Sequence, residues 1–146
     1  MVDDDETQPE AMAWQLTFDA RSPHDQADFW AAVLGYQVED NQELIRRLLA
    51  AGHAYESDTV THRGALSWDG LSAIRGDGRR ILFQTVPEPK TVKNRVHLDL
   101  NVGSLRLATE LSRITGLGAT LVGEVNDRGS HHFVLQDPEG NEFCVQ

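Results

Sequence analysis

The sequence predicts one series of elements twice, and this repeat most constrains what the chain can fold into. A strand, a helix and three short strands are predicted up to residue 88, and the same series is predicted again from residue 93. The halves share little identity, so the repeat lies in the order of elements. We therefore expect one α+β domain of two βαβββ modules, at 13–88 and 93–146, joined by a linker at 89–92.

The first half contains clear helix and turn signals. Alternating apolar and polar residues predict a strand at 14–20. Ser22 is the predicted N-cap of the first helix, Asp25 is expected to close a capping box, and Gly35 is the predicted C-cap. The other predicted elements of this half are a helix at 42–51, a loop at 52–63, and strands at 65–68, 71–75 and 80–86.

The same patterns return in the second half. An alternating segment predicts a strand at 95–101, and an amphipathic segment predicts a helix at 104–115. The segment at 137–141 has the composition of a turn. Three further strands are predicted at 119–125, 131–136 and 142–146.

Composition and charge exclude several classes of protein. At 146 residues the chain fits one domain with a core of its own. The net charge is −10, and the residues at 1–12 form an acidic tail that we expect to be disordered. No basic patch favours nucleic acid as a partner, and no apolar run suits a membrane. Cys144 is the single cysteine, so we expect a reducing, cytoplasmic setting.

Strand alternation predicts which side chains face the helices. In the first strand of the first half, the apolar set expected to pack on the helices is Trp14, Leu16 and Phe18. The opposite, polar face of that strand carries Gln15, Thr17 and Asp19. In the strand at 95–101 the polar face carries Arg95, His97 and Asp99. A ligand cup and a plain solvated face both give this alternation.

Three motifs follow one another in a characteristic order. They are FWAAVLGY at 29–36, KNRVHLDL at 93–100 and DPEGNEF at 137–143. They resemble the vicinal-oxygen-chelate superfamily, which contains glyoxalase-like, bleomycin-resistance-like and dioxygenase-like proteins, and in particular a glyoxalase-like branch common in actinobacteria. The resemblance covers 13–146 and implies an incompletely closed mixed barrel or cup. Its members include lyases, isomerases, dioxygenases and small-molecule binders, so the fold does not choose a reaction.

The resemblance also implies where a metal would be bound. Metal-dependent members carry His and Glu ligands on the first and last strands of each module, and the matching positions here are Gln15, Gln84, His97 and Cys144. We expect these four side chains to converge in one cavity. One imidazole, one thiol and two neutral amides form a poor donor set for a divalent ion. We therefore expect no bound cofactor, with a divalent metal as the less favoured alternative.

Each candidate residue has a structural alternative. His97 is the candidate general base or ligand, but it also suits a hydrogen-bonded structural role. Cys144 is a candidate nucleophile, and its structural alternative is an inert thiol. Arg95 and Asp99 are candidates for binding a polar ligand, and their structural alternative is an ion pair with each other. Trp68 is a candidate for the wall of the cup. The predicted ligand-binding set is Gln15, Thr17, Trp68, Gln84, Arg95, His97, Asp99 and Cys144.

Two functions of different class remain. The favoured one is a protein that binds a small organic ligand in the cup between its modules without a catalytic metal. The alternative is a glyoxalase-type lyase or isomerase that uses His97 for proton transfer or as a metal ligand. Family habit and an edge-rich sheet also predict a homodimer.

Overall fold

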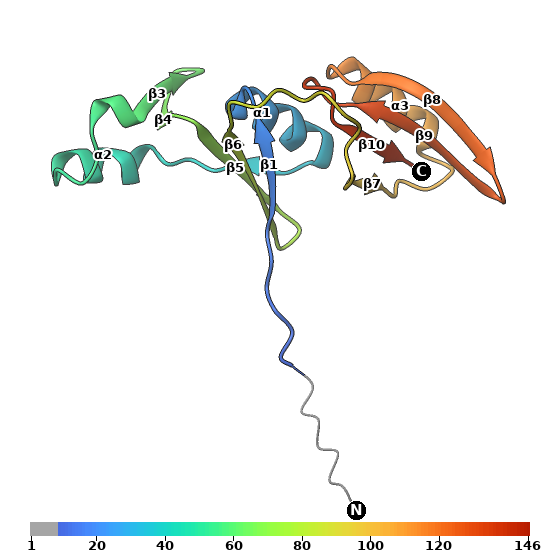
Figure 1. Ribbon diagram of the computed structural model, residues 1–146, viewed down its shortest axis with the longest axis horizontal. Helices are drawn as coiled ribbons and strands as arrows, with labels where there is room; N and C mark the ends of the chain where they lie inside the picture. Colours follow the sequence, from blue (N-terminus) through green and yellow to red (C-terminus); the bar gives the residue numbers. More distant parts are fainter. Residues whose placement is uncertain (1–8) are drawn as a thin grey trace, which may run out of the picture.

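The computed structural model describes residues 9–146, and its two main sheets lie side by side (Figure 1). The architecture is mixed α+β and no barrel closes. Most of the predicted acidic tail lies outside the described residues; the part at 9–12 is exposed.

The first module follows the predicted series with one addition. Its sheet has the order β1-β6-β5-β2, in which β1 is parallel to β6. Helix α1 packs on this sheet through contacts with β5, β6 and β1. The elements are β1 (Leu16–Ala20), α1 (Pro23–Leu34), β2 (Gln37–Val38), β5 (Leu71–Gly76) and β6 (Arg79–Thr85). The two-residue β2 was not predicted, because so short a segment gives no alternation.

The second module repeats this topology. Its sheet has the order β7-β10-β9-β8, in which β7 is parallel to β10. Since both sheets place the first strand of the module beside its last, the predicted two-module fold is confirmed. The elements are β7 (Asp99–Leu100), α3 (Leu107–Gly116), β8 (Thr120–Asp127), β9 (Ser130–Gln136) and β10 (Glu142–Val145).

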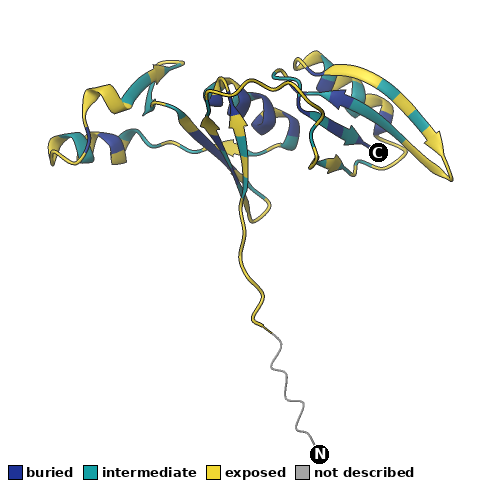
Figure 2. Cartoon of the chain, in the orientation of Figure 1, coloured by how far each residue is buried: buried dark blue, intermediate teal, exposed yellow. Residues whose placement is uncertain are grey.

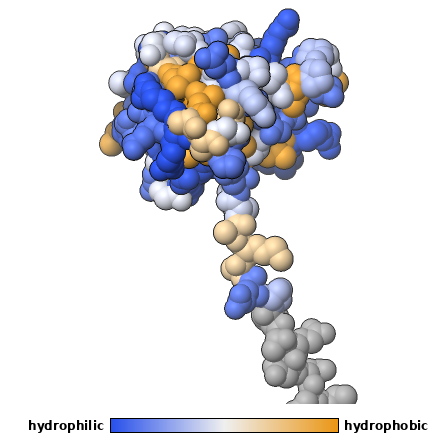
Figure 3. All heavy atoms as spheres, turned by 90° about the vertical axis from the view of Figure 1, so that its left-hand side faces the viewer, coloured by the Kyte–Doolittle hydropathy of each residue, from blue (hydrophilic) through white to orange (hydrophobic). Residues whose placement is uncertain are grey.

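Residues between β2 and β5 form an insertion that the second module lacks. It comprises α2 (Gln42–Ala50), the short 3₁₀ helix η1 (Glu56–Asp58), and β3 (Thr59–His62) paired with β4 (Ala65–Trp68). It lies on the side of the first module away from the second (Figure 1). Seen from this side, the surface is largely hydrophilic around small hydrophobic areas (Figure 3).

The prediction of a loop at 52–63 is wrong for Thr59–His62, which form strand β3. Arg63 and Gly64 have φ values of 47° and 77°, so both central residues of the β3–β4 turn are left-handed. This is the geometry of a tight hairpin turn, in which Asn-Gly or Asp-Gly is the usual pair. Because an arginine occupies the first position instead, the sequence did not predict this hairpin.

The strand predicted at 95–101 is shorter than expected. Only Asp99 and Leu100 form β7, opposite Cys144 and Val145 of β10, and the Cys144 N–H donates to the Leu98 carbonyl at 2.9 Å just before this pair. The side chain of Glu142 instead accepts a hydrogen bond from the backbone N–H of Asn94 at 2.9 Å. A side-chain contact therefore joins the segment before Leu98 to β10.

The start of α1 differs from its predicted capping box. Ser22 makes no side-chain capping bond. The carboxylate of Glu139, in the β9–β10 turn of the other module, instead accepts bonds from the backbone N–H groups of Arg21 at 2.6 Å and Ser22 at 3.0 Å. The C-cap prediction is confirmed, since Gly35 is left-handed with φ 72°.

One hydrophobic core joins the two modules. Trp30 on α1 and Phe143 on β10 are both fully buried, and their ring centroids lie 4.9 Å apart in an edge-on contact. Buried residues concentrate along α1 and the inner strands (Figure 2). Leu16 and Phe18 pack against this core as expected, but Trp14 is 82% exposed. Trp14 precedes the first ladder pair of β1, so the alternation there has no sheet to act on.

Candidate functional site

A cavity of about 790 Å³ lies between the two modules. One wall is β1, which contributes Thr17 and Asp19. The facing wall is the segment at 94–98 together with the start of β10. Apolar side chains from both modules complete the lining: Leu16, Phe18, Trp30, Leu98 and Phe143. The combination of apolar surface with a few polar groups is typical of a small-molecule site.

The charged groups of this cavity are mainly acidic. Its lining contains the carboxylates of Asp19, Glu88, Glu139 and Glu142, against the cations Arg21 and Lys90. Glu142 accepts bonds from the Asn94 backbone and from Lys90 Nζ at 3.2 Å. These two contacts, the backbone bond first, hold the pKa of Glu142 below its usual value against the opposing effect of burial. Glu142 is therefore ionised at neutral pH.

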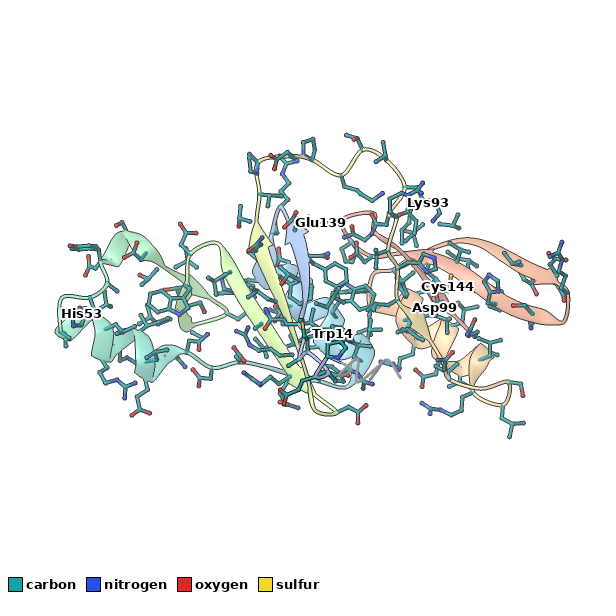
Figure 4. All side chains as sticks on the ribbon, turned by 60° about the horizontal axis from the view of Figure 1, so that its bottom comes forward. Trp14, His53, Lys93, Asp99, Glu139 and Cys144 are labelled. Carbon is teal, nitrogen blue, oxygen red and sulfur yellow. The ribbon has the colours of Figure 1, made fainter. Side chains whose placement is uncertain are left out.

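His97 lines the same cavity and forms a cluster with Asp99 and Cys144. His97 Nδ1 lies 2.9 Å from Asp99 Oδ1, and the donor atoms of all three residues lie within 4.8 Å of one another. Asp99 and Cys144 are partners in the β7–β10 ladder. Figure 4 shows them, with Lys93, on the second module. In the neutral tautomer in which Nδ1 donates to Asp99, Nε2 carries the lone pair.

The environment of Cys144 disfavours its thiolate. Burial raises the pKa of the thiol, and the negative charge of Asp99 raises it further, while Lys93 opposes this weakly. Nucleophilic cysteines need the opposite shift.

The two glutamines at the inherited metal positions lie at opposite ends of the β1–β6 pair. The parallel register of β1 and β6 pairs Gln84 with Asp19, and Gln84 Nε2 donates to Asp19 Oδ1 at 3.0 Å. Gln15 lies at the other end, where its Oε1 accepts from Arg80 Nη1 at 2.8 Å. Four residues separate Arg80 from Gln84 along the strand, which is about 13 Å. Gln15 instead lines a separate hollow of about 1380 Å³ that also contains Asp99.

The remaining predicted residues have different surroundings. Thr17 lines the cavity between the modules. Trp68 lines a smaller hollow of about 270 Å³ in the insertion. Arg95 is exposed, and it makes no ion pair within residues 9–146; Asp99 pairs with His97 instead.

Sequence reasoning missed several groups of the cavity. Asp19, Asn94, Glu139 and Glu142 were not predicted as site residues, although all four contribute to its lining. The DPEGNEF motif contains the two glutamates, so their position beside the turn was the available signal. The partners of Asn94 come from tertiary contact alone.

Comparison with known proteins identifies the family. The model of the glyoxalase-like domain family matches residues 15–146, nearly the whole chain. The chain belongs to this family. No curated protein sequence matches it.

Solved structures agree with the glyoxalase-like fold. The fosfomycin resistance protein FosX from Mesorhizobium loti gives a TM-score of 0.64 at 10% identity, covering 95% of this chain and 92% of that one. A glyoxalase/bleomycin resistance protein/dioxygenase family enzyme from Burkholderia phytofirmans gives 0.61 at 16% identity, covering 90% and 94%. At such identities the likeness shows the fold alone, and this fold is that of the vicinal-oxygen-chelate superfamily.

A metal ion is recorded in one related structure. A mutant FosX from Listeria monocytogenes, complexed with Mn(II) and 1S,2S-dihydroxypropylphosphonic acid, gives a TM-score of 0.62 at 10% identity and covers 95% of this chain and 90% of that one. In the present glyoxalase-like chain, the four inherited positions do not fit such an ion. Gln15 and Gln84 are separated from each other and hydrogen-bonded elsewhere, and the Cys144 thiol favours its protonated form.

Within residues 9–146 of this glyoxalase-like chain, no helix has the length and apolar character needed to cross a membrane.

Proposed function

We propose that the protein binds a small organic ligand in the cavity between its modules, without a catalytic metal. The observation that carries this proposal is the cavity itself, whose apolar and polar lining residues come from both modules. The unsuitable donor set at the inherited positions supports binding without metal. The single cysteine supports a reducing, cytoplasmic setting.

The charge of the lining indicates the class of ligand. Carboxylates outnumber cations, and within residues 9–146 only Glu142 of the four forms an ion pair, with Lys90, while Asp19, Glu88 and Glu139 form none. A neutral or weakly basic ligand is therefore favoured over an anion. Leu16, Phe18 and Leu98 provide the apolar surface for its carbon skeleton.

A ligand screen on the full chain tests this proposal. Chelator-treated protein is screened by thermal shift against neutral compounds, organic amines and organic acids of similar size. We expect hits among the first two classes, and calorimetry should show that Asp19→Asn or Thr17→Val weakens an amine hit about tenfold. The matched control is Asp127→Asn, at an exposed β-hairpin position outside the cavity. Binding restricted to acids, or unchanged by the cavity variants, would contradict the proposal.

One contact favours a second candidate, the lyase or isomerase. The Asp99 carboxylate orients the His97 imidazole through Nδ1 and leaves Nε2 free to take a proton. If a bound ligand is turned over, His97→Ala should abolish turnover and retain binding, and Asp99→Asn should lower kcat with little change in KM. Turnover that survives His97→Ala excludes this assignment.

A homodimer is the second part of the proposal. Each sheet is covered by a helix on one face, and the other face carries partly exposed groups: Thr17, Leu82 and Gln84 on the first module, and Val134 and Cys144 on the second. Gln84 and Cys144 thus lie on open faces of different modules. Pairing the open first-module face of one copy with the open second-module face of another covers both.

A further inference from the structure

A second group of metal-binding side chains lies where the insertion meets α1. Asp25 and Asp28 are three residues apart on α1, so they share a face of the helix. His62 ends β3 at the tip of the inserted hairpin, and its Nε2 lies 2.6 Å from Asp28 Oδ2. One donor atom from each of the three residues lies within 4.8 Å of the other two. Segments far apart in sequence thus bring two carboxylates and an imidazole together.

The surroundings hold this imidazole in place. His24, one residue before Asp25, stacks its ring on that of His62, with centroids 5.1 Å apart and planes inclined by 25°. His24 Nε2 is itself fixed by a 2.8 Å hydrogen bond to the backbone carbonyl of Trp68, at the end of β4. The His62 and Asp28 side chains are only 25% and 21% exposed. The donors are therefore positioned by packing.

Of the two carboxylates, only Asp28 has an arginine partner within the described residues. Arg63 Nε lies 3.0 Å from Asp28 Oδ2, but the Arg63 side chain is 75% exposed and projects from a turn. Asp25 forms no salt bridge with any described residue. A hollow of about 270 Å³ opens beside Asp28 and His62, with space for water molecules. Two carboxylates, one imidazole and access for water match the donor set of zinc.

We propose that Asp25, Asp28 and His62 bind one Zn²⁺ ion, which clamps the inserted hairpin to α1. The ion takes the place of the direct contact between His62 Nε2 and Asp28 Oδ2, and water completes its coordination. It displaces the Arg63 guanidinium, because both compete for the Asp28 carboxylate. Such a clamp would add to the contacts that hold the hairpin, because β3 and β4 form a separate two-stranded sheet that joins neither main sheet.

Another histidine–carboxylate pair provides a matched control. His131 Nε2 lies 2.7 Å from Glu124 Oε1 on the β8–β9 hairpin. This pair has nearly the same geometry as His62 with Asp28, but among the described residues no further donor joins it. A pair alone does not make a zinc site, so His131→Ala should leave zinc binding unchanged.

Calorimetric titration of chelator-treated full-length protein with ZnCl₂ tests the clamp. The background is His97→Ala/Cys144→Ala, which removes the other described group of donors. We expect one zinc per chain in this background. Adding His62→Ala or Asp28→Asn should weaken binding at least a hundredfold, and Asp25→Asn about tenfold. Arg63→Ala should strengthen binding, which no purely structural role of the salt bridge predicts.

A second measurement keeps the test independent of folding. Because zinc and protons compete for the imidazole, binding should weaken as the solution is made acidic, and zinc should raise the melting temperature of the parent but not of His62→Ala. Circular dichroism identifies any variant that fails to fold. Absence of zinc binding in the His97→Ala/Cys144→Ala background, or binding insensitive to His62→Ala and Arg63→Ala, overturns the proposal.

Discussion

At the scale of single residues, Asp137 has the most demanding position. Its side chain is almost fully buried in the β9–β10 turn, with no cation among its hydrogen-bond partners. It accepts bonds from Gln26 Nε2 at 2.7 Å and Trp30 Nε1 at 3.0 Å, both on α1 of the other module. It also accepts from the backbone N–H groups of Glu139 and Asn141. A buried carboxylate is tolerated here because several donors replace its hydration.

Asp137→Ala should therefore be strongly destabilising. The substitution leaves buried donors of Gln26 and Trp30 without an acceptor, each costing about 1–3 kcal/mol. We expect the free energy of unfolding to fall by about 3 kcal/mol or more, measured by urea denaturation with an unchanged m-value. Asp127→Ala, at the exposed end of β8, is the control and should change stability by less than about 0.5 kcal/mol. Equal losses in the two variants would contradict this account.

At the scale of elements, α1 begins on a cap that another module supplies. Local sequence offers Ser22, but the bonds to the free N–H groups come from Glu139. Glu139 lies beside the end of β1, close to where α1 starts (Figure 4). Its negative charge also suits the positive end of the helix dipole. The β9–β10 turn thus fixes α1 through both Asp137 and Glu139.

The cap can be tested by comparing two truncations. Glu139→Ala should lower the free energy of unfolding by about 1 kcal/mol, within the range of N-cap removals. Ser22→Ala should have almost no effect, because the hydroxyl makes no capping bond. Urea denaturation measures both. If Ser22→Ala is the more costly change, the local capping box acts after all.

The edge of the first sheet depends on a carboxylate between two arginines. Glu39 follows β2 and accepts from Arg80 Nε at 2.7 Å, and it also pairs with Arg75 on β5. The Arg80 hydrogen bond is the main reason that the pKa of Glu39 lies below its ordinary value of 4.5, with burial opposing it. These contacts tie β5 and β6 to the short β2.

This pKa shift predicts a pH-dependent stability. A carboxyl whose folded pKa is lowered stabilises the fold above its unfolded pKa, and the contribution disappears as the pH falls through the folded value. Glu39→Gln should therefore cost about 1 kcal/mol at pH 7 and much less near pH 3. Urea denaturation from pH 3 to 7 measures the difference, and Glu43→Gln on α2 is the control. A difference that is constant over this range would contradict the assignment.

At the scale of the whole molecule, the two sheets share one core but keep separate open faces. The shared core fixes how the modules lie relative to each other, through α1 and β10. The open faces carry Leu82 on β6 and Val134 on β9, both half-buried. A second copy of the chain is the partner that we propose for them.

The dimer has a direct test in solution. Sedimentation of the full chain at high micromolar concentration should show a dimer, and Leu82→Glu should shift it to monomer by placing a charge in the interface. Val92→Glu, at an exposed position of the linker region, is the matched control and should leave the dimer intact. A parent protein that remains monomeric at these concentrations excludes the dimer.

The sequence by itself determined the repeated series of elements, most helix and strand positions and the end of α1 at Gly35. Periodicity and glycine conformation act locally, so residues near one another in the chain suffice for these features. The sequence could not determine the Glu139 cap, the burial of Asp137 or the exposure of Trp14, because each depends on a partner, or the lack of one, far away in the chain. The same holds for the candidate site. Residue types indicated His97, but only the strand registers decided that Cys144 lies opposite Asp99 and that Gln15 and Gln84 lie at opposite ends of the β1–β6 pair. A shift of register changes every neighbour along a strand, and pairing between distant segments is settled by packing of the whole core.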